Sequence, residues 1–338
     1  MRAALVDPMG IENLRIVEMD EPEPGPGEVL VAIRAASLNY RDILAVKGGY
    51  GRMQKQARLI PLSDAAGEVV AVGAKVRAWK VGDRVLNCFF PRWQAGPLRL
   101  ECVTEDLGGM FDGVAVEKRV FREDALVRMP ASMSFPEAAA LPCAAATAWN
   151  GLIERGGIRP GQRVLTQGTG GVSLFALQFA KMAGAAVFAT SSSPEKLELL
   201  KRLGADHVVN HREDAEWGKT IMGLTGGAGI DHVVDIGGAE TLKHSMRALR
   251  PGGTITLIGV VTGPRAELNV PIVAMQALRL EGANAGSRLM LQQMVDAIAA
   301  NGLKPVIDEK RFGLSELADG LRYLEAGRHV GKVCIDIQ

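Results

Sequence analysis

A glycine-rich turn near the middle of the chain has the residue types that bind a pyrophosphate. The run Gly168-Thr169-Gly170-Gly171-Val172-Ser173 follows the strand-like segment RVLTQ and opens the helix-like segment SLFALQFAKMAG. Glycines permit a tight turn and a close backbone approach, and the N–H groups at the start of a helix attract an anion. Ser173 stands where the usual fingerprint has its third glycine. Because strand, turn and helix follow in the required order, the run predicts a dinucleotide site built on residues 168–172.

The next strand-like segment ends on serines, which indicates the type of dinucleotide. AAVFAT leads into Ser191 and Ser192, and the first acidic residue after it is Glu195. A site that prefers NAD usually has an acid here to bind the ribose 2′-hydroxyl. A 2′-phosphate would instead meet the serine hydroxyls and the ammonium of Lys196, so we expect NADPH as the cofactor. The stretch SSSPEK is also typical of a helix N-terminus, with serine as the N-cap and proline in the first turn, and both interpretations can hold together.

Two kinds of pattern follow each other along the chain. The first ~130 residues are rich in β-branched segments, such as VLVAIRAASL and GEVVAVG, that are bounded by glycine or proline. From Pro130 onward, short apolar runs alternate with helical patterns, which predicts a parallel sheet covered by helices on both faces. The run HVGKVCIDI near the end is strand-like again. Residues 91–113 show no clear period, so we expect a long loop there.

Composition narrows the class of protein. The 338 residues suggest about two domains, and the net charge of +1 gives no field that would favour nucleic acid or an anionic membrane. The first twenty residues carry charges throughout and do not form a signal peptide, and no window reaches the roughly 18 apolar residues of a membrane span. The four cysteines are scattered, which is typical of a reducing compartment. We therefore expect a cytoplasmic protein that acts on a small molecule.

Taken in order, these segments resemble the medium-chain dehydrogenase/reductase superfamily, and within it the zinc-free quinone oxidoreductase branch. The motifs that carry the resemblance are RAASLNYRDI (34–43), IPLSDAAGEVVAVG (60–73), VGDRV (81–85), LPCAAATAW (141–149), GTGGVS (168–173), LGADHVVNHRE (203–213), GGTITLIG (252–259) and GKVCI (331–335). The resemblance implies an α/β fold with a GroES-like β-rich catalytic domain and a Rossmann domain that has a doubly wound parallel sheet. We place these domains at residues 1–128 and 129–275, with 276–338 completing both. It also implies a homodimer or homotetramer.

The resemblance also identifies three positions at which zinc-dependent members hold a catalytic metal. Asn39 and Ser63 occupy the first two positions, and only Cys143 matches the zinc pattern. A catalytic zinc needs three protein ligands and a water, so we expect no metal and interpret Cys143 as a small buried residue. The structural-zinc lobe of relatives needs four closely spaced cysteines, whereas this loop has only Cys88 and Cys102.

Without zinc, hydrogen-bond donors must stabilise the oxygen that becomes anionic when hydride is transferred. Asn39 could donate through its amide, although it could also be a simple turn residue. Tyr50 matches a tyrosine of the quinone reductases and could donate through its hydroxyl, although it could also be a surface aromatic. The adjacent Tyr40 is a third candidate. Asp42 resembles an acid that lies near the active site throughout the superfamily, and we interpret it as an orienting residue.

Further cofactor contacts are implied by the resemblance alone. They fall at strand ends, at a position where quinone reductases have a tyrosine near the 2′-phosphate, and at basic residues that could face phosphate. These residues are Thr147, His211, Gly237, Ile258, Gly259, Val260, Arg288 and Lys332.

The sequence thus predicts an enzyme that uses NADPH to transfer a hydride to a quinone or an α,β-unsaturated carbonyl without zinc. A second hypothesis is an enoyl-thioester reductase or an alcohol/aldehyde dehydrogenase of the same superfamily. A third hypothesis is an NADPH-binding protein without enzymatic activity.

Overall fold

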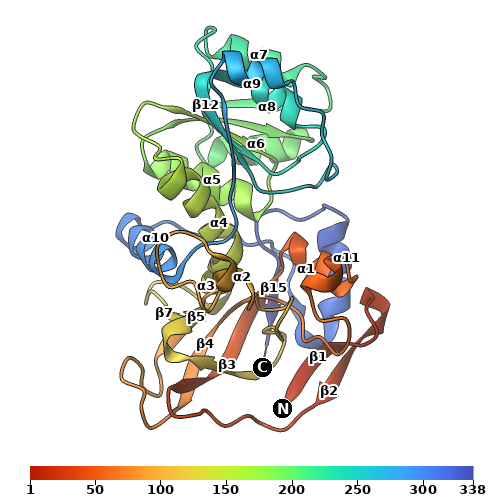
Figure 1. The fold of residues 1–338 in the computed structure, drawn as a ribbon, viewed down its shortest axis with the longest axis vertical. Helices are drawn as coiled ribbons and strands as arrows, with labels where there is room; N and C mark the ends of the chain where they lie inside the picture. Colours follow the sequence, from red (N-terminus) through yellow and green to blue (C-terminus); the bar gives the residue numbers. More distant parts are fainter. Residues whose placement is uncertain (338) are drawn as a thin grey trace. The chain divides into compact units, whose positions relative to one another are not determined.

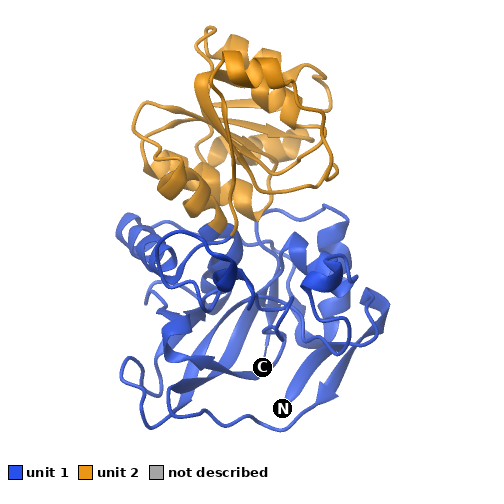
Figure 2. Ribbon diagram, in the orientation of Figure 1, with its two compact units in different colours: residues 1–146, 285–338 blue, residues 147–284 orange. Residues whose placement is uncertain are grey.

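The chain forms two compact units in the computed structural model, which describes residues 1–337. One unit comprises residues 1–146 and 285–338, and the other comprises residues 147–284 (Figure 2). The first division lies beyond residue 128, because the helix Phe135–Ala139 packs on the first unit and the carbonyl of Ala139 accepts a 2.8 Å hydrogen bond from Ser37 Oγ. The second division lies beyond residue 275, because the strand Arg279–Gly282 still belongs to the sheet of the second unit. Both compact-unit boundaries therefore differ from the predicted ones.

The first unit is built on a mixed sheet in which a strand from the N-terminal half of the chain pairs with the C-terminal strand (Figure 1). Its path is β14-β15-β3-β4-β5-β7, and β6 pairs with β3 beside the end of β15. The strands are β3 (Glu28–Ser37), β4 (Asp64–Val72), β5 (Arg84–Asn87), β6 (Lys118–Arg122), β7 (Leu126–Arg128), β14 (Phe312–Gly313) and β15 (Cys334–Asp336). β1 (Arg2–Val6) and β2 (Leu14–Glu18) form an antiparallel pair. Pairing of Cys334 with Ser37 brings the C-terminal strand next to the residues that precede α1.

The helices of this unit range from four to fourteen residues in length. They are α1 (Tyr40–Val46), α2 (Leu100–Val103), α3 (Phe135–Ala139), α10 (Arg288–Asn301) and α11 (Leu317–Glu325). Single 3₁₀ turns lie at Ile11–Asn13, Gly51–Met53, Glu123–Ala125 and Leu314–Glu316. The apolar faces of β3, β4, α1 and α11 share one core, which includes Ile33, Ile43 and Leu321. The segment 91–113, predicted as a loop, contains α2 and a small cluster around Phe90, Trp93 and Cys102.

The second unit is a six-stranded parallel sheet in the order β10-β9-β8-β11-β12-β13. Its strands are β8 (Arg163–Gln167), β9 (Ala186–Ser191), β10 (His207–Asn210), β11 (Ile230–Asp235), β12 (Leu249–Leu257) and β13 (Arg279–Gly282). The chain runs outward from β8 in one direction and then restarts beside β8 with β11. This order is that of a Rossmann sheet, whose ligands bind where the direction reverses. The predicted fold class is confirmed.

Helices connect these parallel strands, and α4 (Ala146–Trp149) precedes the first of the strands. The connecting helices are α5 (Gly171–Met182), α6 (Pro194–Arg202), α7 (Trp217–Leu224), α8 (Leu242–Ala248) and α9 (Val270–Met275). Wide π-helical turns at Leu141–Ala145 and Asn150–Arg155 flank α4. Trp217 and Ile221 of α7 and Met246 of α8 pack with strand residues in one core. Among the described residues, no helix is long and apolar enough to cross a membrane.

Candidate functional site

The predicted phosphate turn joins β8 to α5. Gly168 has a φ of +77°, and its backbone N–H donates to Thr190 on the neighbouring strand at 2.7 Å. A Cβ added to Gly168 would meet no atom closer than 3.9 Å, so the left-handed backbone, rather than crowding, requires glycine here. Gly170 caps α5 without a side-chain hydrogen bond, so the first backbone N–H groups of a twelve-residue helix are left for another acceptor. This turn fits the pyrophosphate of a dinucleotide.

A buried carboxylate organises the neighbouring strand end. Asp235 is fully buried, and its Oδ1 accepts the backbone N–H groups of Gly237 and Gly238 at 3.0 Å each. Its Oδ2 accepts Ser245 Oγ at 2.6 Å and Gln167 Nε2 at 3.2 Å. Gln167 ends β8, so the carboxylate ties together the two strands at which the sheet order reverses. The predicted cofactor residue Gly237 is thereby held in a fixed turn.

Gly259 lies in the loop that follows β12, beside that turn. An added Cβ at Gly259 would lie 2.1 Å from the carbonyl oxygen of Ile236, so only glycine allows the two backbones to approach this closely. Ile258 is half-buried and Val260 is 46% exposed. The predicted residues of this strand end therefore line the same loops as Gly237, and their contact with a cofactor stays a prediction.

Four of the residues predicted to lie near a 2′-phosphate are found at or beside the end of β9. Ser191 pairs with Asn210 of β10, and its carbonyl accepts the backbone N–H of His211 at 3.0 Å. Ser193 caps α6 through a hydrogen bond from the backbone N–H of Lys196 at 3.4 Å. Ser191 is almost fully buried, whereas Ser192 and Lys196 are half-buried and His211 is exposed. Thr147, another predicted contact, is buried where the second unit begins.

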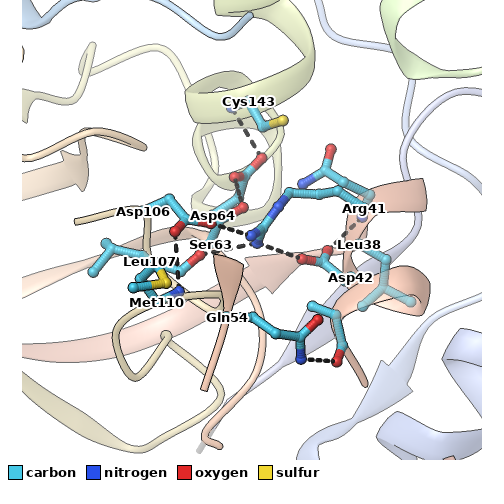
Figure 3. A network of polar contacts seen from close by, with 12 residues as sticks. Leu38, Arg41, Asp42, Gln54, Ser63, Asp64, Asp106, Leu107, Met110 and Cys143 are labelled. Carbon is cyan, nitrogen blue, oxygen red and sulfur yellow. Dashed lines mark hydrogen bonds and ion pairs between the residues drawn. The ribbon is translucent and has the colours of Figure 1, made fainter. Parts of the chain in front are cut away.

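Asp42, one of the predicted catalytic residues, lies with Arg41 in a polar network at the start of α1 (Figure 3). Asn39 precedes the helix, and its backbone N–H donates to Asp42 Oδ2 at 2.7 Å. Asn39 Nδ2 is buried and has no hydrogen-bond partner in the described structure. A buried donor that stays without a partner costs about 1–3 kcal/mol, so Nδ2 needs an acceptor that the chain does not supply, such as an ordered water or a bound ligand. Tyr40 begins the helix and is 43% exposed.

Arg41, which the sequence analysis did not single out, is the centre of this network. Its guanidinium donates to Asp106 Oδ2 at 2.5 Å and to the carbonyl oxygen of Leu107 at 2.9 Å, and it also contacts Asp42 Oδ1 at 3.3 Å. The same guanidinium lies 5.9 Å from the ring centroid of Tyr50. Arg41 thus ties the 91–113 segment to α1 and brings Tyr50 beside Asp42. An added Cβ at Gly109 would lie 2.2 Å from Asp106 Oδ2 and 2.6 Å from the guanidinium, so a side chain there would displace this ion pair.

Burial changes the acidity of these groups. It raises the pKa of Asp42 to about 6, an effect that the nearby Arg41 opposes and Asp64 reinforces. Burial also raises the pKa of Tyr50, which keeps its phenol protonated as a hydrogen-bond donor. The structure therefore brings Asn39, Asp42 and Tyr50 into one network, while Tyr40 is the most exposed of the four predicted catalytic residues.

Two of the three positions that correspond to zinc ligands in relatives, Ser63 and Cys143, are linked by a second carboxylate. Asp64 is fully buried; its Oδ1 accepts Ser63 Oγ at 2.6 Å and its Oδ2 accepts the backbone N–H of Cys143 at 3.1 Å. Burial and the charge of Asp64 raise the pKa of the Cys143 thiol, whereas a metal ligand must be a thiolate. Asn39 supplies an amide, and within residues 1–337 no cluster of His, Cys, Asp or Glu could hold a metal ion. This donor set does not fit zinc.

Two residues predicted to bind the cofactor have other partners. Lys332 is 2% exposed, and its ammonium donates to Asn39 Oδ1 at 2.5 Å and to the carbonyl of Leu38 at 2.7 Å. A phosphate contact would require it to leave these oxygens, so we assign Lys332 to the Asn39 cluster instead. Arg288 donates through Nε to the carbonyl of Leu126 at 3.1 Å, which gives it a structural role within the first unit.

Sequence reasoning missed Arg41, Asp64 and Asp106 as members of the network. The available signal for Asp64 was an acid at the start of the largely apolar strand DAAGEVVAV. Arg41 and Asp106 are 65 residues apart and carry no spacing signal.

Known protein families match both the first unit and the parallel-sheet unit of this chain. Residues 25–131 match the model of the alcohol dehydrogenase GroES-like domain, and residues 171–300 match that of the zinc-binding dehydrogenase family. A zinc-type alcohol dehydrogenase-like protein of Schizosaccharomyces pombe is 40% identical over 97% of this chain and 96% of its own length. The chain belongs to the medium-chain dehydrogenase/reductase superfamily. The superfamily predicted from its motifs is thereby confirmed.

Solved structures and a second curated relative extend the comparison. The chain is similar to a putative alcohol dehydrogenase from Sinorhizobium meliloti, with a TM-score of 0.92, 40% identity and coverage of 98% of both chains. It is also similar to a quinone oxidoreductase of Pseudomonas syringae, with a TM-score of 0.82, 28% identity and coverage of 99% of both chains. An acryloyl-coenzyme A reductase of Sulfurisphaera tokodaii is 28% identical over 98% of this chain and 99% of its own length. The protein is an oxidoreductase of this superfamily, whose members bind a nicotinamide dinucleotide.

Proposed function

We propose that this protein uses NADPH to reduce a quinone or an α,β-unsaturated carbonyl, and that it does so without zinc. The observation that carries the proposal is the buried Asn39 Nδ2, a hydrogen-bond donor that no group of the described chain accepts. A substrate carbonyl oxygen is the acceptor that this donor lacks. In a zinc enzyme the metal would polarise that oxygen, but the donor set at Asn39, Ser63 and Cys143 does not fit the metal.

A bound nicotinamide supplies the hydride, and the chain's own residues act on the acceptor. Asn39 donates a hydrogen bond to the carbonyl oxygen, which gains negative charge as hydride reaches the conjugated carbon. The phenol of Tyr50, held protonated beside Arg41, is a second donor in the same network. Asp42 holds the backbone N–H of Asn39 and so fixes the start of α1.

The choice of NADPH rests on the end of β9. Ser191 and Ser192 occupy the place where an NAD-preferring site usually has an acid, and the acidic Glu195 follows only inside α6. A 2′-phosphate carries close to two negative charges at neutral pH and would be repelled by such an acid. Lys196 in the first turn of α6 offers a compensating charge. For these reasons we assign NADPH rather than NADH.

An enoyl thioester is the second candidate substrate. The resemblance to acryloyl-coenzyme A reductase favours it, because the substrate that gives that enzyme its name is also an alkene conjugated to a carbonyl. Both candidates need the same donor at the carbonyl oxygen, and they differ only in the group attached to it.

Steady-state turnover separates the candidates. The purified protein is mixed with NADPH and, in parallel, with 9,10-phenanthrenequinone, a simple enone or crotonyl-coenzyme A, and NADPH absorbance is followed. We expect turnover with the quinone or the enone, and a reduction of at least tenfold in kcat for the Asn39→Ala variant. Faster turnover of crotonyl-coenzyme A would select the second candidate. NADPH binding without turnover of any acceptor would exclude both and leave a binding protein.

A further inference from the structure

Lys332 is an ammonium group held at a fixed place inside the first unit. Its backbone N–H donates to the carbonyl of Val306 at 3.0 Å, and its carbonyl accepts the N–H of Asp308 at 2.9 Å. Gly331 before it has a φ of +68°, and an added Cβ there would lie 2.1 Å from the oxygen of Val306. The backbone at Lys332 therefore has little freedom. A lysine is rarely this deeply buried unless its charge is paired.

The ammonium faces three oxygen atoms. Two are the hydrogen-bonded carbonyl of Leu38 and the side-chain oxygen of Asn39, and the third is Asp64 Oδ2 at 3.7 Å. Asp64 is itself fixed by Ser63 Oγ and by the backbone N–H of Cys143. The positive charge thus has a buried counter-ion that is anchored independently of it. This pairing explains how the lysine is held among the positions that correspond to zinc ligands in relatives.

This arrangement determines which way the Asn39 amide points. An ammonium has three donors and no acceptor, so the amide atom that faces it must be the oxygen. The opposite orientation would set two donor groups against each other at 2.5 Å. Asn39 Nδ2 is therefore turned away from Lys332, where it is buried without a partner. A cation on the oxygen of an amide also polarises the amide and strengthens its N–H groups as donors.

We propose that Lys332 is a positioning residue that holds Asn39 Oδ1 and thereby makes Asn39 Nδ2 a dedicated donor to the substrate carbonyl oxygen. Asp64 is its counter-ion. This inference rests on the proposed function, because it assigns Asn39 the same task. It adds that the donor is oriented by a buried charge, in a place where zinc-dependent relatives use a metal ion.

A double-mutant cycle tests the inference. Lys332→Met keeps the length of the apolar stem and removes the charge, and Asn39→Ala removes the donor. Each single change should lower kcat with the quinone or enone by roughly tenfold to a hundredfold, while the dissociation constant of NADPH changes less than threefold. The double variant should be no slower than Asn39→Ala alone, because Lys332 acts through Asn39. Lys75→Met, an exposed lysine of the same unit, is the matched control and should keep wild-type kinetics.

A second variant covers the case in which Lys332→Met does not fold. Lys332→Met combined with Asp64→Asn removes both charges of the pair. The asparagine keeps one oxygen to accept the Cys143 N–H, and its amide can donate to Ser63 Oγ, which then acts as the acceptor. This charge-free variant should lose as much kcat as Lys332→Met. Adding Asn39→Ala to it should make it no slower than Asn39→Ala alone. Circular dichroism and NADPH binding establish that each variant is folded.

The outcomes separate the two proposals. If Asn39→Ala keeps wild-type kcat with the quinone and the enone, the proposed role of Asn39 is wrong, and the positioning inference is wrong with it. If Asn39→Ala is slow but the charge-free variants are as fast as wild type, only the positioning inference is overturned. The same holds if the losses in the double variant multiply, since Lys332 would then act independently of Asn39.

Discussion

The hydroxyl of Ser173 donates a 2.5 Å hydrogen bond to the backbone carbonyl of Gln167, across the turn that joins β8 to α5. Ser173 is 1% exposed and stands at the third position of the glycine fingerprint, where glycine usually lets the helix lie close to the strand. Here the serine side chain makes the strand–helix contact instead. The departure from the fingerprint is therefore a stabilising feature of the turn.

Ser173→Ala should lower the free energy of unfolding by about 1 kcal/mol, because the buried carbonyl of Gln167 loses this partner. Ser173→Gly restores the fingerprint but should cost about 1 kcal/mol more, because glycine is unfavourable inside a helix. Urea unfolding should therefore rank wild type above Ser173→Ala and that above Ser173→Gly. A glycine variant as stable as wild type would show that the hydrogen bond is without effect.

The contrast between Ser173 and Lys332 explains how far the sequence could predict this site. The phosphate turn and the end of β9 follow from local order, because strand, turn and helix are consecutive in the chain. Lys332 is 293 residues from Asn39 along the chain, and the two residues meet because β15 pairs with β3. From its charge alone, Lys332 could equally face a phosphate of the cofactor. The sequence therefore predicted a phosphate as its partner, whereas the structure pairs it with Asn39 and Leu38. The Arg41–Asp106 pair could not be predicted either, because its two residues are also far apart in the sequence.

Asp42 should make stability depend on pH in an unusual direction. Its folded pKa of about 6 lies above the ordinary value of 3.8, so the folded protein binds this proton more tightly than the unfolded chain. The corresponding stabilisation is complete below pH 4 and is lost as pH rises through 6, by roughly 3 kcal/mol at 1.36 kcal/mol for each pKa unit. Asp42→Asn cannot ionise. The free energy of unfolding of wild type, taken relative to that of the variant, should therefore fall between pH 4 and pH 7 in urea titrations. A constant difference would contradict this assignment.

Metal content tests the zinc-free proposal directly. Asn39 and Ser63 cannot act as thiolate or imidazole ligands, which leaves Cys143 as the one soft ligand of the three positions, so the purified protein should contain well under one zinc per chain. Elemental analysis measures this, and treatment with a chelator should leave turnover unchanged. Stoichiometric zinc together with activity lost to the chelator would mean that these residues hold a metal after all.

The edge strand β13 of the second unit favours association with a second copy of the protein. β13 pairs only with β12 among the described strands, and the neighbouring α9 buries none of its own residues. Val270 is 63% exposed and Met275 is 86% exposed, which favours burial against a second copy. We predict a homodimer or a larger even oligomer that Met275→Asp weakens. Light scattering at micromolar concentration measures this, with Met53→Asp, at an exposed methionine of the other unit, as the control. A monomeric wild type would refute it.

Cofactor preference should change with two substitutions at the end of β9. Lys196→Ala removes a charge that could pair with the 2′-phosphate, and a charge-assisted hydrogen bond contributes about 1.5–3 kcal/mol. NADPH binding should therefore weaken by roughly tenfold to a hundredfold, whereas NADH binding should barely change, because its 2′-hydroxyl carries no charge. Ser192→Asp should repel the phosphate and offer the ribose an acceptor; we place the acid at Ser192 because Ser191 is almost fully buried.

The measurement is the ratio of the NADH to the NADPH dissociation constant in wild type and both variants, with Lys219→Ala, at an exposed lysine of α7, as the control. We expect a ratio well above one that falls in both variants. If wild type prefers NADH, or if neither variant lowers the ratio, the 2′-phosphate is not recognised at the end of β9.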